Sequence, residues 1–139
     1  NLAAVRESCG DRAVLRAIHY YTENSIVEQE LQAVQSRDMD AFLELVRQSG
    51  RSSWMFLQNV STYRDPKNQG LGVLLAAAEQ LLGREGACRV HGGGFAGTIQ
   101  AFVPLRRLDT FRRMMERISG PGSCHVLSFR SSGTCTLIS

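Results

Sequence analysis

The sequence predicts an α+β fold in which helices pack on one face of an antiparallel sheet. Three observations support this prediction: a long opening stretch with apolar residues at helical spacing, two strand-like segments on either side of a glycine run, and turn signals around a last helix and hairpin. Helices gathered on one side of antiparallel strands form a recurrent α+β arrangement. The 139 residues suit one domain, so we expect residues 1–139 to form a single unit.

The first half of the chain is predicted to be helical. One long helix is expected from about residue 5 to residue 36, because few breakers follow Gly10. Val27, Leu31 and Val34 are spaced by four and three and form a helical stripe of apolar residues. A second helix is expected to begin at Asp38, which can cap it, and to end near Gly50.

The second half alternates between strands and helices after an irregular stretch. Helices are expected over residues 68–82 and 108–118. Strands are expected over residues 87–91, 98–103, 124–130 and 134–138, the last two forming a hairpin. Cys124 and Cys135 could face each other across that hairpin, although free thiols are the expectation for all four cysteines in a cytoplasmic protein.

Composition and charge exclude several classes of function. The net charge of +3 comes from scattered arginines without interleaved aromatics, which argues against nucleic-acid binding. No apolar run approaches the roughly 20 residues that span a bilayer, so no membrane partner is expected. Histidines and cysteines lack the close spacings of metal ligands, and no nucleophile motif is present. We therefore expect neither a metal site nor a catalytic residue within the chain.

The best candidate site is the bare segment at residues 92–97. It consists of Gly92, Gly93, Gly94, Phe95, Ala96 and Gly97. Because the segment lies between two strands, it matches neither a dinucleotide-binding fingerprint nor a phosphate loop. Two interpretations stay open: a tightly packed turn, or a nest of backbone amides that binds an anion.

Several polar residues could support this segment. His19 and Glu23 are four apart on the first helix and therefore neighbours on one face, with Arg16 close by. They could form a local hydrogen bond that fixes how the helix docks, or brace the glycine segment from behind. His91, at the end of the preceding strand, could contact a phosphate or sugar or simply pack there.

These residues together resemble the C-terminal half of a galactokinase, a member of the GHMP kinases. The similarity rests on Arg16-Ala17-Ile18-His19, Glu23-Asn24, Gln48-Ser49, Ser52-Ser53 and the glycine run. It implies a ferredoxin-like C-terminal domain and a glycine-rich loop that braces the phosphate site. ATP and Mg²⁺ would be bound mainly by an N-terminal GHMP kinase domain of the same polypeptide. Ala96 and His91 depart from the family pattern.

The resemblance implies phosphoryl transfer from ATP to a sugar hydroxyl, at C1 of galactose, by the full-length protein but not by this chain alone. A change of Gly94 to Val is expected to lower turnover with the fold largely intact. Three alternatives stay open: a non-catalytic relative that senses sugar and ATP, a GHMP kinase for another hydroxylated substrate, and a stand-alone ferredoxin-like ligand-binding protein.

Overall fold

The computed structural model describes residues 1–95 and 97–129 and has an α+β fold. The helices are α1 (Leu2–Cys9), α2 (Asp11–Ser36), α3 (Met39–Ser52), α4 (Gly70–Leu82) and α5 (Leu108–Ser119). A π-helical turn, η1 (Ser53–Leu57), continues α3, and a 3-10 turn, η2 (Leu105–Arg107), precedes α5. The strands are β1 (Ala87–Val90) and β2 (Ile99–Phe102). The predictions for residues 68–82, 87–91, 98–103 and 108–118 are confirmed as helix, strand, strand and helix.

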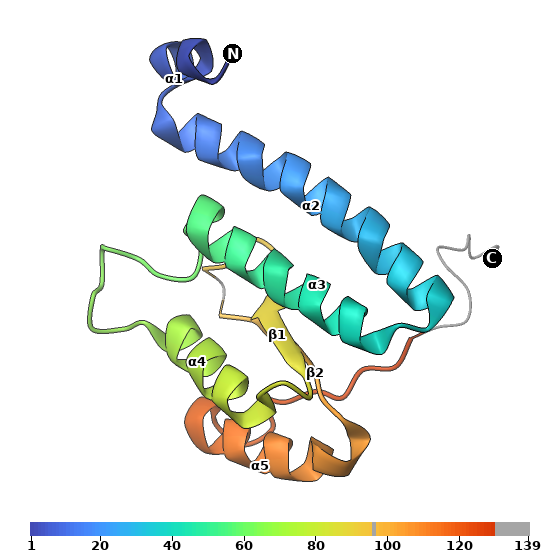
Figure 1. The fold of residues 1–139 in the computed structure, drawn as a ribbon. Coiled ribbons are helices and arrows are strands. Elements are labelled where there is room, and N and C mark those ends of the chain that lie inside the picture. Colours follow the sequence, from blue (N-terminus) through green and yellow to red (C-terminus); the bar gives the residue numbers. More distant parts are fainter. Residues whose placement is uncertain (96, 130–139) are drawn as a thin grey trace, which may run out of the picture.

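Helices cover both faces of the two-stranded sheet, so the prediction of a single covered face is wrong (Figure 1). The strands are antiparallel, with Ala87 opposite Phe102. On one face, Phe102 meets the ring of Phe42 on α3 edge-on, with ring centroids 5.1 Å apart. On the other face, Cys88 and Val90 join the core formed with α4 and α5. Because side chains alternate along a strand, apolar residues at consecutive positions bury both faces.

Two separate apolar clusters hold these layers together. The larger one fills the space between the sheet, α4 and α5, and its buried members are Val60, Leu71, Leu75, Ala78, Leu82, Cys88, Val90 and Met115. The smaller one joins α2 to α3 through Ile26, Ala33 and Leu45. The order of layers is therefore α2, α3, the sheet, and then α4 with α5 (Figure 1).

The long first helix is broken at Gly10, contrary to the prediction of one helix from residue 5 to residue 36. Gly10 has a φ of 80°, a left-handed conformation that a helix interior does not allow. Its N–H donates to the carbonyl oxygen of Arg6 at 2.9 Å and closes α1. The chain then turns, and α2 runs without interruption from Asp11.

The apolar stripe that marks α2 in the sequence is not its buried face. Val27, Leu31 and Val34 are 58%, 58% and 54% exposed. The buried face is a different one and carries Ile26 and Ala33, which are seven residues apart and therefore two turns apart along the helix. The short side chain of Ala33 suits the packing against α3, while the regular stripe of larger residues faces outward.

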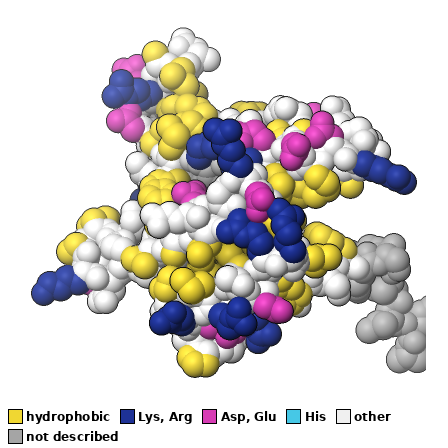
Figure 2. All heavy atoms as spheres, turned by 60° about the horizontal axis from the view of Figure 1, so that its bottom comes forward, with side chains coloured by type: hydrophobic (Ala, Val, Ile, Leu, Met, Phe, Trp, Pro, Cys, Tyr) yellow, Lys and Arg dark blue, Asp and Glu magenta, His cyan; other side chains and the backbone are white. Residues whose placement is uncertain are grey.

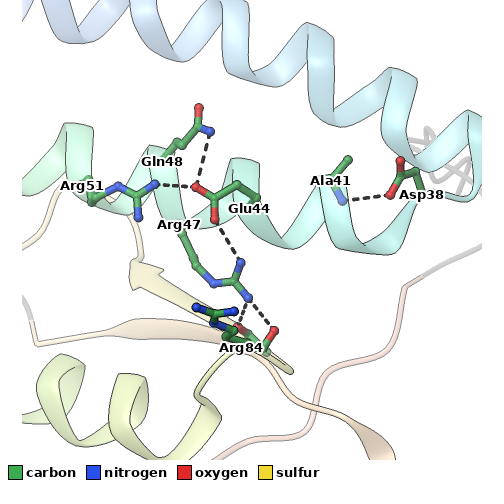
Figure 3. A network of polar contacts seen from close by, with 8 residues as sticks. Asp38, Ala41, Glu44, Arg47, Gln48, Arg51 and Arg84 are labelled. Atoms are coloured by element: carbon green, nitrogen blue, oxygen red, sulfur yellow. Dashed lines mark hydrogen bonds and ion pairs between the residues drawn. The ribbon is translucent and has the colours of Figure 1, made fainter.

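Helix α3 begins as predicted and is anchored at two points (Figure 3). The Asp38 carboxylate accepts a hydrogen bond from the N–H of Ala41 at 2.9 Å, which confirms its capping role. Arg47 extends from α3 to the turn after α4 and donates to the carbonyl oxygens of Arg84 and Gly86, at 2.9 and 2.8 Å. These bonds fix α3 over the end of β1 nearest that turn.

The last predicted strands differ in outcome. Residues 124–129 form no strand in the structure, and Val126, Leu127 and Phe129 are 63–90% exposed. The apolar pattern there predicted a strand, but no described segment offers it a hydrogen-bonded partner. The predicted strand at residues 134–138 lies outside the described residues. Cys9, Cys88 and Cys124 are free thiols, while the fourth cysteine, Cys135, lies outside the described residues.

The surface mixes charges of both signs. On the face of the molecule drawn in Figure 2, Lys and Arg side chains lie beside Asp and Glu side chains among the described residues. Arg106 and Arg107, for example, both pair with Glu85. Within the described part of the chain, no helix has the length and apolar character needed to cross a membrane.

The glycine-rich loop as candidate functional site

The glycine segment is the connection between β1 and β2. The N–H of His91 donates to the carbonyl oxygen of Thr98 at 3.0 Å, so the antiparallel pairing extends one step beyond Val90 and Ile99. Residues 92–97 then form the loop above this last pair. We call this segment the glycine loop. Ala96 lies outside the described residues.

The backbone of the glycine loop is largely left-handed. Gly92, Gly94 and Gly97 have φ values of 66°, 73° and 83°, and Phe95 has a φ of 53°. Left-handed backbone is free of steric cost for glycine but costs other residues roughly 1–2 kcal/mol. Three of the four described glycines in the loop are thus explained by backbone conformation. Phe95, the non-glycine exception, points outward and is 62% exposed.

The inner side of the glycine loop rests on Asn59. The N–H of Phe95 donates to the main-chain oxygen of Asn59 at 3.0 Å, and the Asn59 side-chain Nδ2 donates to the oxygen of Gly93 at 3.3 Å. A Cβ atom added to Gly94 would lie 2.4 Å from the Asn59 oxygen and 2.7 Å from its Cβ and Cγ. Gly94 is buried for this reason. A larger side chain at position 94 would force the loop or Asn59 to move, which argues against the expectation that a Val there leaves the fold largely intact.

The outer side of the loop is open. Cβ atoms added to Gly92, Gly93 or Gly97 would have no heavy atom of the described residues within 4 Å, apart from their own chain neighbours. Gly93 differs from the other two because its φ is not left-handed. Neither backbone conformation nor packing within the described residues requires glycine at this position. Close approach of a group from outside these residues is the remaining physical reason for a bare backbone there.

Asn59 reaches the loop because the chain leaves α3 irregularly. The π-helical turn η1 closes with a bond of 3.1 Å from the N–H of Gln58 to the oxygen of Ser53. Gln58 has a φ of 54°, which reverses the chain and directs Asn59 inward. Asn59 is 2% exposed. Single π-turns of this kind are often found at functional sites.

A second polar cluster lies between α2, α3 and β1. The carboxylate of Glu23 accepts a hydrogen bond from Ser49 at 2.7 Å and lies 3.3 Å from the guanidinium of Arg89. Nδ1 of His19 lies 2.9 Å from the hydroxyl of Ser52. The expected bond between His19 and Glu23 is thus replaced by two bonds to α3. These residues fix how α2 docks on α3 and β1.

The electrostatics of this cluster follow from burial. Burial lowers the pKa of His19, an effect that Glu23 opposes and Arg89 reinforces. Burial raises the pKa of Glu30, against the nearby charge of Arg89. The Oε1 atom of Glu23 is buried without a hydrogen-bond partner among the described residues. Glu23 is thus held by its other oxygen, between a hydroxyl donor and a guanidinium.

The structure brings together only some of the predicted supporting residues. Glu23 reaches β1 through Arg89, which lies three positions before Gly92, and so braces the strand that enters the loop and not the loop itself, while His19 contacts Ser52 of α3. Arg16 is exposed and makes no hydrogen bond or ion pair within the described part of the chain. The side chain of His91 is exposed as well.

Sequence reasoning missed Asn59 and Arg89, and it named Ser49 and Ser52 only within the family resemblance, not as partners of His19 and Glu23. Ser49 and Ser52 are three apart and so share a helical face, which is a signal that could have matched them to His19 and Glu23. Nothing local in the sequence marks Asn59, because its position depends on the π-turn before it.

A cavity and the buried Cys88 thiol lie at β1, the strand that leads into the glycine loop. A cavity of about 110 Å³ is lined by residues of α3, η1, α4 and β1, among them Trp54, Glu79 and Cys88, but not by the loop. Burial raises the pKa of the Cys88 thiol to about 12, which keeps it protonated. Across residues 1–95 and 97–129, no three His, Cys, Asp or Glu side chains are grouped to hold a metal ion.

Comparison with known proteins points to one kind of enzyme. The chain is 30% identical over 103 residues to the galactokinase of Mannheimia succiniciproducens, which covers 74% of the chain. It is 28% identical over 113 residues to that of Actinobacillus pleuropneumoniae and 30% identical over 100 residues to that of Pasteurella multocida. No family model matches the chain, and no solved structure matches it significantly. The chain is therefore galactokinase-like in sequence, and its match spans about a quarter of the length of these relatives.

Proposed function

We propose that the chain is the C-terminal domain of a galactokinase-like sugar kinase, with the glycine loop placed against the phosphates of ATP. The full-length protein would transfer the γ-phosphate of ATP to a sugar hydroxyl, at C1 of galactose. The bare outer side of the loop at Gly93 carries this proposal, because nothing in the described chain requires glycine there. The choice of reaction rests on the sequence similarity to galactokinases.

The chemistry of phosphoryl transfer suits such a loop. Catalysis of this reaction consists mainly of positioning and of stabilising charge on the phosphoryl oxygens. A backbone without side chains lets a phosphate come close, and consecutive N–H groups in left-handed turns favour an anion. The loop would thus brace the phosphate region, with His91 at its edge, while the polar cluster at His19 and Glu23 holds β1 rigid.

The remaining parts of the reaction would come from outside the described residues. Mg²⁺ needs oxygen ligands in an octahedral arrangement, and the described residues offer no group of carboxylates for it. The residues that act on the sugar hydroxyl and the main ATP site are assigned to an N-terminal domain of the same polypeptide. The chain alone would accordingly show no turnover.

The test is a change of Gly93 to Ala in the full-length protein. The added methyl group meets no atom of the described chain and needs no unusual φ, so the free energy of unfolding should stay within about 0.5 kcal/mol of the wild type. A methyl group against a phosphate should still lower kcat/KM for ATP by about tenfold or more, since small misplacements in a reacting geometry are costly.

A matched control is available at Gly70, which also has ordinary φ and open space around it. Gly70→Ala should leave both stability and kinetics close to those of the wild type. If Gly93→Ala and Gly70→Ala turn over ATP equally well, the outer side of the loop does not face the nucleotide.

A further inference from the structure

We propose that Asn59 is the positioning residue of the glycine loop, acting through its carboxamide and its main-chain oxygen. We call these contacts of Asn59 with the glycine loop the Asn59 clasp. Its functional importance rests on the proposed function of the loop, whereas the test of its structural role does not require kinase activity. Asn59 precedes Phe95 by 36 positions in the sequence but lies directly beneath the loop in the fold, with two hydrogen bonds to it.

The contacts converge on three consecutive loop residues. Asn59 holds the oxygen of Gly93 from its side chain, touches Gly94 along its own backbone, and accepts the N–H of Phe95. Asn59 therefore donates one hydrogen bond to the loop, accepts another from it and packs against it at Gly94. Four described loop residues have left-handed backbone, and glycine-rich segments lose much conformational entropy when ordered. Such a loop needs an external anchor to keep one shape.

Stability alone does not explain an asparagine at this position. Asn59 is 2% exposed, and its Oδ1 atom has no hydrogen-bond partner among the described residues. A buried acceptor without a partner costs about 1–3 kcal/mol. An aliphatic side chain of similar size would avoid that cost, but it could not donate to the oxygen of Gly93. We infer that the donor at Nδ2 is what the position requires.

The experiment replaces the donor while keeping the shape of the side chain. In Asn59→Asp, an ionised carboxylate would face the oxygen of Gly93 and repel it. Hydrogen exchange, followed by NMR on the 139-residue chain at neutral pH, should show protection of the Phe95 N–H reduced about tenfold or more, the equivalent of one lost hydrogen bond. Amides in β1 and α4 should keep their protection.

Acidification provides a readout that a merely structural role would not move. Desolvation raises the pKa of a buried carboxyl group, and the protonated form can donate to the oxygen of Gly93. Protection factors at Phe95 should therefore recover in Asn59→Asp as the pH is lowered toward 5, but not in the wild type, where they are already high. Asn24→Asp, the same change on the exposed face of α2, should alter nothing at the loop.

A second variant covers the case in which Asn59→Asp does not fold. Asn59→Leu removes the donor without burying a charge and keeps the main-chain oxygen, so Phe95 should lose protection and acid should not restore it. Unchanged protection at Phe95 in the folded variants overturns the proposal, and so does an equal loss of protection throughout β1 and α4.

Kinetics of the Asn59 variants in the full-length protein link the Asn59 clasp to turnover. A lower kcat with intact ATP affinity is the expected result. A loss of protection without that kinetic effect would leave the clasp standing and count against the proposed function.

Discussion

A methyl group at position 94 should destabilise the fold much more than the same group one residue earlier. In Gly94→Ala, the new Cβ would lie 2.4 Å from the Asn59 oxygen, so either the loop or the chain at Asn59 must move. Overpacking of a well-packed site costs about 1–3 kcal/mol, and an alanine at a φ of 73° adds about 1–2 kcal/mol. The expected loss in the free energy of unfolding is therefore about 2–5 kcal/mol.

Urea unfolding followed by circular dichroism measures this difference. The midpoint of Gly94→Ala should fall while the slope with urea stays constant, since the surface exposed on unfolding is unchanged. Gly92→Ala has the left-handed φ without the clash and should lose only about 1–2 kcal/mol. Gly93→Ala has neither and serves as the baseline. Equal midpoints for the position 93 and position 94 variants would refute the described packing of the loop on Asn59.

Three further predictions concern the rest of the fold. Arg47→Ala removes two bonds to the turn after α4 and should cost about 1.5–3 kcal/mol in urea unfolding, whereas Arg51→Ala, which loses a surface ion pair, should cost at most about 1 kcal/mol. Burial lowers the pKa of His19 below 6.5, so the unfolded chain binds the proton first; stability should fall as the pH drops below 6.5, and His19→Gln should flatten this dependence. A thiol reagent should modify exposed Cys9 in the native chain and Cys88 only after unfolding; rapid native modification of Cys88 would contradict its burial and its pKa of about 12.

Local patterns in the sequence predicted the elements whose form depends on nearby residues. The helix at α4, both strands and the cap at Asp38 are of this kind, because spacing, turn residues and capping act over a few positions. The glycine loop was placed between the correct strands for the same reason. Three of its glycines have positive φ values, as expected for a tight turn rich in glycine.

Features that depend on distant partners were not predictable in this way. The spacing of Val27, Leu31 and Val34 defined a helical face, but which face of α2 meets α3 depends on the packing at Ile26 and Ala33. The strands carry apolar residues at consecutive positions, which allowed cover on one face or on both. The role of Asn59 depends on a π-turn, and periodicity does not report the single extra residue that such a turn contains.

The most direct test of the central claim is an assay of ADP release by the full-length protein with Mg²⁺, ATP and a panel of hexoses and sugar alcohols. The proposed function predicts release of ADP that depends on galactose, and none from the 139-residue chain by itself. A folded full-length protein that binds ATP but releases no ADP with any of these sugars would contradict the kinase and favour a non-catalytic sensor.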